Sequence, residues 1–159
     1  MPDTTAPAKL KHVLDLARQE ADLRGDRRIG TDHLLLALMH DRAAVPARAL
    51  GVTVEEGRAA LNDLDRAALA AIGIHLDAPL DPPAVRGKRH VPFNSAVRAT
   101  LVAAKTAADS ERRGRRLEAR HLLLALLATR HPDPAADLLT ALSVDGPAVR
   151  ERLTVPSER

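Results

Sequence analysis

Two short stretches of the sequence hold the residue types that most often do chemistry in proteins. Thr31, Asp32 and His33 stand together in one stretch, and Arg120 and His121 stand together in the other. The two histidines could ligate a metal ion, but neither belongs to an H-E-x-x-H pattern or to a cluster of other ligands. The serines lack the G-x-S-x-G setting of a hydrolase, and the chain contains no cysteine. We therefore expect no catalytic residue, no metal and no cofactor, and we interpret these side chains as packing or binding residues.

The two stretches belong to an internal repeat. The segment TDHLLLALM at 31–39 recurs 88 residues later as ARHLLLALL at 119–127, and the flanking residues recur with it. Self-similarity of this kind indicates tandem copies of one structural unit. We predict a single domain over residues 1–159, with repeat one at 8–72, a linker at 73–92 and repeat two at 93–153.

Each copy has the apolar periodicity of helices. The first helix is predicted from a stripe at helical spacing that ends near Gly25, namely Leu10, Val13, Leu14, Ala17 and Ala21. Thr31 is predicted to cap a buried second helix over about 32–40, and a short third helix is expected at 44–50. Thr53 is predicted to cap a fourth helix from 54 to about 64, with an extension to 72.

The composition supports an all-α fold. Apolar residues make up 45% of the chain, but they are mostly alanine and leucine, with one phenylalanine and neither tryptophan nor tyrosine. Four prolines between 73 and 92 predict a linker, after which Asn94 or Ser95 would cap the second copy. We expect two tandem, pseudo-symmetric four-helix repeats joined by this Pro-rich linker.

The charge of the chain is modest and local. Its net charge of +3 is concentrated in residues 111–120, which hold five arginines and two glutamates. A nucleic-acid-binding protein is therefore an alternative, but stacking aromatics and a recognition helix are missing, which makes nucleic acid an improbable partner. The sequence shows no signal-peptide pattern and no apolar run of about 18 residues. We expect a cytoplasmic protein without a membrane partner.

The repeated motif resembles the Clp N-terminal domain, the double-repeat module at the front of the ClpA, ClpB and ClpC unfoldases. The segment IGTDHLLLAL at 29–38 is similar to the IGTEHILLGL of the ClpC type, and VPFN at 91–94 resembles the IPFT that opens its second repeat. The likeness covers about residues 8–153. Because no G-x-x-x-x-G-K-[ST] motif is present, the resemblance implies a stand-alone binding module without a motor and without enzymatic activity.

The resemblance also implies candidate ligand-binding residues. Some ClpC N domains bind phosphoarginine at two pseudo-symmetric sites, where the acid of each GTEH motif pairs with the guanidinium and a threonine at the first helix start lies near the phosphate. Carried over, Asp32 is the acid of the first site, and the Phe-Thr pair of that site is replaced by Ala6-Pro7. The second site keeps Phe93 and Asn94, but Arg120 replaces its acid. Thr31, beside Asp32, is included among the candidates.

Two further interpretations of these residues remain open. Cyclic-peptide natural products dock across the two first helices of ClpC N domains, and Lys11, Phe93 and Arg98 match three positions of that surface. Asp32 could instead serve only as a first-turn acid that complements the helix dipole, and Phe93 as a hydrophobic staple before Asn94.

The resemblance predicts a non-catalytic protein- or peptide-binding accessory of the Clp protease system. Its expected partners are Clp substrates, adaptors, degradation tags or components of the Clp ATPase and protease. A decoy that sequesters ClpC-directed cyclic peptides is the alternative within this family.

Overall fold

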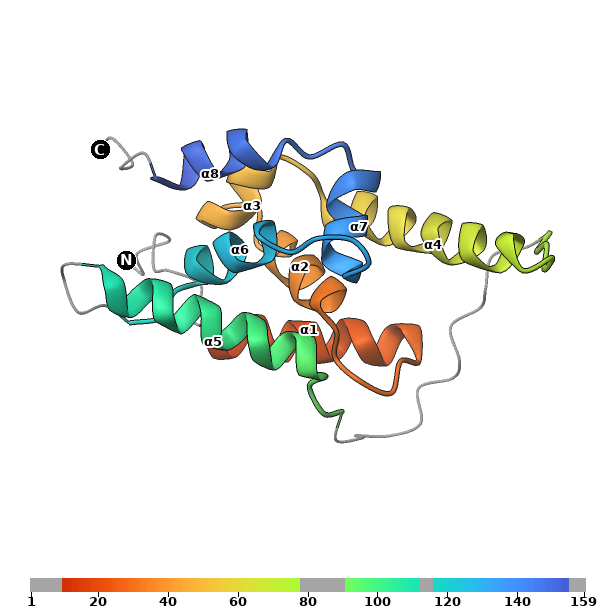
Figure 1. Cartoon of the computed structure of the whole chain (residues 1–159), viewed down its shortest axis with the longest axis horizontal. Coiled ribbons are helices and arrows are strands. Elements are labelled where there is room, and N and C mark those ends of the chain that lie inside the picture. Colours follow the sequence, from red (N-terminus) through yellow and green to blue (C-terminus); the bar gives the residue numbers. More distant parts are fainter. Residues whose placement is uncertain (1–9, 78–90, 112–115, 155–159) are drawn as a thin grey trace.

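The computed structural model describes residues 10–77, 91–111 and 116–154, and within these ranges it consists of helices and connecting loops (Figure 1). The helices in chain order are α1 (Leu10–Arg24), α2 (Thr31–Met39), α3 (Val45–Leu50), α4 (Val54–Ala71), α5 (Ser95–Ser110), α6 (Ala119–Leu127), α7 (Pro134–Ala141) and α8 (Gly146–Thr154). In the described residues, extended pairing is limited to one isolated bridge between Ile29 and Phe93. The predicted all-α class is confirmed.

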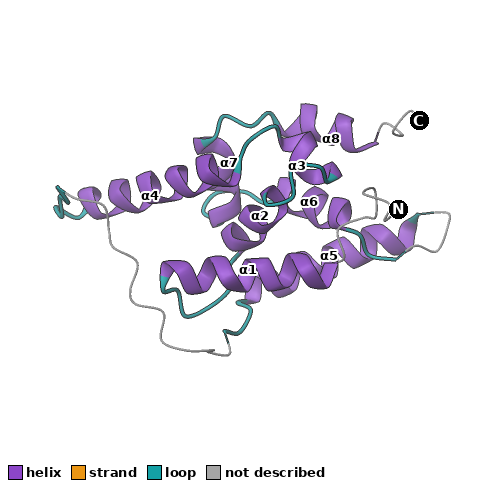
Figure 2. Ribbon diagram, turned by 180° about the vertical axis from the view of Figure 1, so that it is seen from behind, coloured by secondary structure: helices purple, strands orange, loops and turns teal. Residues whose placement is uncertain are grey.

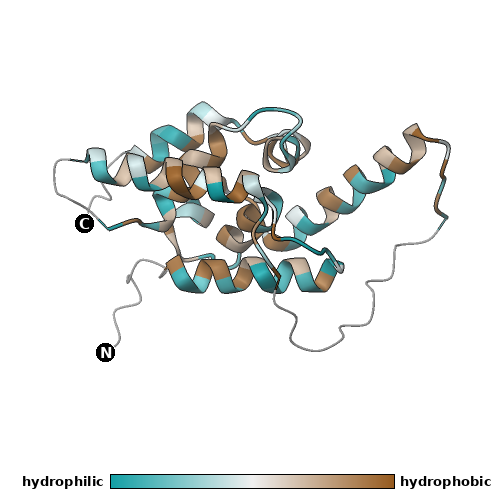
Figure 3. Ribbon diagram, turned by 60° about the horizontal axis from the view of Figure 1, so that its bottom comes forward, coloured by the Kyte–Doolittle hydropathy of each residue, from teal (hydrophilic) through white to brown (hydrophobic). Residues whose placement is uncertain are grey.

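The core is built around the two copies of the repeated motif. Helices α2 and α6 lie in the middle of the molecule, with α1 and α5 on one side and α3, α7 and α8 on the other (Figures 1 and 2). Six leucines of the motif are completely buried, namely Leu34, Leu35, Leu36, Leu122, Leu123 and Leu126. Hydrophobic and hydrophilic residues alternate along the outer helices (Figure 3), which is why these helices bury only one face.

Several helix ends are formed by capping residues that can be recognised in the sequence. Gly25 follows α1 with a φ of 72°, a left-handed conformation that glycine adopts without a Cβ clash. Thr53 accepts a hydrogen bond from the backbone N–H of Glu56 at 3.1 Å, and Asn94 accepts one from Val97 at 2.9 Å. The prediction that Thr53 caps α4 is confirmed, and of the two predicted candidates, Asn94 and Ser95, Asn94 is the cap of α5.

The prediction that Thr31 caps α2 is wrong. The N-cap is Gly30, Thr31 is the first helical residue, and the Gly30 N–H donates to Nδ1 of His33 at 2.8 Å. The histidine at the third helical position therefore satisfies a backbone donor of the helix start. The hydroxyl of Thr31 is free to bond elsewhere.

Helix α4 differs most from its counterpart in the second copy. It has 18 residues where α8 has nine, so the predicted extension to about residue 72 is present. The end of α4 projects away from the other helices in Figure 1, and Ile72 beyond it is 73% exposed. Most of the predicted linker, residues 78–90, lies outside the described residues, so the repeat boundaries stay a prediction. None of the described helices has both the length and the apolar sequence that crossing a bilayer requires.

Candidate functional site

The starts of α2 and α5 are joined directly although they belong to different repeats. The Ile29 N–H donates to the carbonyl of Pro92 at 2.9 Å, and the Asn94 N–H donates to the carbonyl of Ile29 at 3.0 Å. These two bonds align the segment before α2 with the segment before α5. Asp32 of the first repeat is therefore placed with Phe93 and Asn94 of the second repeat.

The carboxylate of Asp32 and the amide of Asn94 lie over the same backbone atom. A Cβ added to Gly30 would lie 2.5 Å from Asp32 Oδ1 and 3.4 Å from Asn94 Nδ2. Glycine at position 30 thus leaves room for the carboxylate, and an alanine there would displace it. The sequence interpretation grouped Asn94 with Arg120, whereas the structure places Asn94 beside Asp32. Ala6 and Pro7, which that interpretation assigned to the first site, lie outside the described residues.

The carboxylate oxygens of Asp32 can accept hydrogen bonds that no described residue donates to them. Its side chain is 15% exposed, and its carboxylate makes no hydrogen bond to any other part of the chain that the structure describes. His33 Nδ1 lies 3.6 Å away, but this nitrogen already accepts the Gly30 N–H and so carries no proton to donate. A partly desolvated, unpaired carboxylate favours a ligand with N–H donors and a positive charge, above all a guanidinium.

His33 holds the start of α2 in place. It is buried, and while Nδ1 accepts the Gly30 N–H, Nε2 lies 2.7 Å from Oδ2 of Asp26. This arrangement assigns the ring proton to Nε2, which donates to the carboxylate. Burial alone would raise the pKa of Asp26, but the hydrogen bond from His33 and the charge of Arg24 outweigh it and lower the pKa. His33 is thus a positioning residue behind the Asp32 carboxylate.

His121 plays the same part at the start of α6. Its Nδ1 accepts the Glu118 N–H at 3.0 Å, and its Nε2 lies 3.0 Å from Oε1 of Glu111. Both histidines therefore pack and cap, as the packing interpretation predicted. The described residues contain no group of three or more His, Asp or Glu side chains that could hold a metal ion.

Arg120, at the position that corresponds to Asp32, is held by two carboxylates. Its Nε donates to Glu118 at 2.9 Å and its Nη2 to Glu111 at 2.7 Å. The hydrogen bonds from Arg120 and His121 lower the pKa of Glu111 to about 2, so both partners remain charged. The cation beside the N-terminus of α6 is thus neutralised within the chain. Within the described ranges the starts of α2 and α6 therefore differ in kind, because the first carries an acid without an ion-pair partner of its own chain and the second a closed ion-pair cluster.

Thr31 faces the core and not the candidate site. It is completely buried, its hydroxyl donates to Oδ1 of Asp133 at 2.6 Å, and it accepts the Ala135 N–H at 3.3 Å. These bonds join the start of α2 to the start of α7. The inclusion of Thr31 among the ligand-binding candidates is therefore corrected, because its hydroxyl is already used and shielded from solvent.

The remaining candidates lie around the first helical turns. Phe93 is half-buried and packs against the core, which supports the staple interpretation and leaves part of the ring accessible. Lys11 and Arg98 are exposed in the first turns of α1 and α5. The structure brings together Asp32, Phe93 and Asn94 through the paired segments.

Sequence reasoning missed three residues that shape these helix starts. Gly30 leaves the space that the Asp32 carboxylate occupies, and Glu111 and Glu118 close the cluster around Arg120. The signal for the two glutamates was present, because both flank an arginine-rich run and could have been read as partners of an arginine.

Comparisons with known proteins bear on the family and the fold of the chain. Residues 2–56 match the Clp repeat (R) N-terminal domain family. No curated protein matches the chain significantly in sequence. Among solved structures, the N-terminal domain of the caseinolytic protease associated chaperone ClpD from Arabidopsis thaliana has a TM-score of 0.64 at 16% identity. The match covers 96% of this chain and 94% of that one. The predicted likeness to the Clp N-terminal domain is therefore confirmed, with the family signature in the first repeat and the fold across both repeats.

Proposed function

We propose that this chain is a cytoplasmic, non-catalytic protein- and peptide-binding accessory of the Clp protease system. It recognises substrates, adaptors or degradation tags through the junction of α2 and α5. The observation that carries the proposal is the carboxylate of Asp32, which is unpaired among the described residues and lies beside the amide of Asn94 where the two repeats meet.

The chemistry of this junction supports a guanidinium-bearing ligand. A carboxylate accepts two parallel hydrogen bonds from a guanidinium, and such bonds to charged groups contribute about 1.5–3 kcal/mol each. The Asn94 amide nitrogen donates and therefore suits an oxygen of the same ligand. Phosphoarginine combines both groups, so we propose it as the tag that this junction reads.

One such site per chain is expected, because Arg120 is held by Glu111 and Glu118. The same neutralisation weakens the nucleic-acid alternative, since Arg120 contributes no free charge to the basic run. Arg112, Arg113 and Arg115 of that run lie outside the described residues.

Cyclic peptides are the second candidate ligand, because Lys11 and Arg98 are exposed and Phe93 is partly accessible. A Phe93→Ala variant separates the two ligands. It is expected to abolish the binding of a ClpC-directed cyclic peptide and to weaken that of a phosphoarginine peptide only slightly.

The proposal is tested by calorimetric titration with a synthetic peptide that carries one phosphoarginine. We expect one site per chain and a loss of about tenfold or more in the Asp32→Asn variant, which keeps the shape and removes the charge. Asp109→Asn is the matched control, because Asp109 is an exposed acid at the far end of α5. Equal affinity in wild type and Asp32→Asn, or no heat at millimolar peptide, contradicts the proposal.

A further inference from the structure

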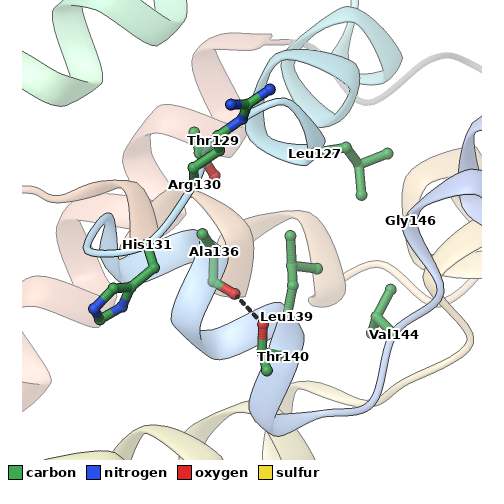
Figure 4. A pocket seen from close by; sticks show the side chains of 9 residues that line it. All are labelled: Leu127, Thr129, Arg130, His131, Ala136, Leu139, Thr140, Val144 and Gly146. Atoms are coloured by element: carbon green, nitrogen blue, oxygen red, sulfur yellow. Dashed lines mark hydrogen bonds between the residues drawn. The ribbon is translucent and has the colours of Figure 1, made fainter.

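A hollow of about 310 Å³ lies between the end of α6, helix α7 and the start of α8 (Figure 4). Figures 1 and 2 place α7 and α8 on the side of the molecule opposite to α1 and α5, so this hollow is separate from the α2–α5 junction. It is lined by Leu127, Thr129, Arg130, His131, Ala136, Leu139, Thr140, Val144 and Gly146. Its volume is at the lower end of the roughly 300–1,000 Å³ of ligand sites, which suits one or two residues of a peptide.

The hollow combines an aliphatic surface with one full positive charge. Leu127, Leu139 and Val144 come from three different segments and point toward the same space in Figure 4. Arg130 is the one lining side chain that is charged at every ordinary pH. It is exposed at the edge and makes no ion pair with any residue in the described ranges.

The acids near the hollow are already engaged. Asp137 Oδ1 lies 2.7 Å from Nδ1 of His131, and Asp145 Oδ1 accepts the Ala148 N–H at 3.3 Å. Neither acid lines the hollow. Among the lining side chains the full charge is therefore that of Arg130, and the complementary ligand group is an anion.

We infer that this hollow binds the carboxyl-terminal residue of a polypeptide that ends in a branched aliphatic side chain. The side chain contacts Leu127, Leu139 and Val144, and the terminal carboxylate pairs with the guanidinium of Arg130. In a polypeptide, only the carboxyl-terminal residue carries an aliphatic side chain and a carboxylate on the same Cα. The two groups are then close enough together to fit a hollow of this size. Arginine suits this role because its planar fork binds both carboxylate oxygens.

Gly146 provides a variant that fills the space without forcing the backbone. A Cβ added there meets no atom within 4 Å, so a larger side chain enters open space at the start of α8. We therefore expect Gly146→Leu to fold normally and to occupy part of the hollow. Arg130→Gln removes the charge while keeping a shorter, polar side chain.

The test is fluorescence anisotropy with N-terminally labelled peptides that end in Ala-Ala-Leu, either as the free acid or as the amide. We expect the free acid to bind at least tenfold more tightly than the amide. Arg130→Gln should remove this preference, and Gly146→Leu should weaken the binding of the free-acid peptide at least tenfold. Lys105→Gln, an exposed cation on α5, is the control and should behave as wild type, with circular-dichroism melts confirming that each variant is folded.

Equal binding of acid and amide overturns the inference, as does a preference that survives Arg130→Gln or full affinity in a folded Gly146→Leu. No binding of either peptide at millimolar protein overturns it as well. Asp32→Asn should leave the ratio of acid to amide binding unchanged, so this result and that for the α2–α5 junction are independent.

Discussion

Replacing Thr31 by valine separates a structural role from a ligand-binding role for this residue. Valine has nearly the same shape, so the packing around the start of α2 is preserved and only the hydroxyl is lost. That hydroxyl is fully buried and donates to the carboxylate of Asp133 at 2.6 Å, which makes it a hydrogen bond to a charged group. Such bonds contribute about 1.5–3 kcal/mol.

Asp133 also accepts the Ala135 N–H at 2.9 Å, a bond that does not need the Thr31 hydroxyl, so we expect the cap of α7 to survive and the loss to be confined to the link between repeats. For a chain of this size, about 1.5–3 kcal/mol corresponds to a fall in Tm of about 3–12 °C. Urea unfolding and calorimetry measure both quantities. Thr106→Val is the control, because Thr106 is exposed and, in the part of the chain that the structure describes, its hydroxyl bonds only to the Val102 carbonyl of its own helix.

The reasoning is refuted if Thr31→Val is as stable as the wild type, within about 0.5 kcal/mol, like the control. It is also refuted if the variant keeps its stability but loses affinity for the peptide, because Thr31 would then contact the ligand. A loss of stability with unchanged affinity for the phosphoarginine peptide is the predicted result.

The remaining predictions concern the core, acid stability and the candidate site. Leu35→Asp places an unpaired charge in the core, at a cost of several kcal/mol, and should abolish cooperative melting; a cooperatively melting variant would contradict the helix register. Burial would raise the pKa of Glu20, but hydrogen bonds, chiefly from Arg58, lower it below 4.5. The charged form of Glu20 therefore stabilises the fold above pH 4.5, and this contribution is lost as the pH falls through the lowered pKa. Glu20→Gln should therefore lower Tm at pH 7 and lose less further stability between pH 5 and 3 than the wild type does. Gly30→Ala should change the free energy of unfolding by less than about 1 kcal/mol. It should nevertheless weaken the binding of the phosphoarginine peptide about tenfold, because the added Cβ displaces the Asp32 carboxylate. Unchanged affinity would show that the position of this carboxylate does not matter.

The helices were predictable because their signals are local. The stripe from Leu10 to Ala21 predicted α1, and the side chains of Thr53 and Asn94 predicted two helix starts. Glu20 was not recognised as a core residue, although it lies one helical turn from Ala17 on that same stripe. An acid on an apolar stripe indicates that basic side chains from other segments pair with it, as Arg58 and His40 do here.

The contacts between the repeats were not predictable from one sequence. Thr31 is paired with Asp133, which lies 102 residues away, so a local rule assigned its hydroxyl to the helix cap instead. Asn94 lies beside Asp32 because the backbone of Ile29 forms hydrogen bonds with the segment before α5. The apolar periodicity of the sequence does not predict this bridge. The hollow around Arg130 is lined by residues of three helices and of the loops between them, and helical periodicity does not predict how these segments meet.

The central claim is that the junction of α2 and α5, and not the start of α6, recognises the partner. The most direct measurement is a ¹⁵N-labelled NMR titration with the phosphoarginine peptide. The amide signals of Gly30, Asp32 and Asn94 should shift in a saturable way, while those of Glu118 and Arg120 stay in place. Shifts centred on Arg120 with Asp32 unaffected would contradict the account.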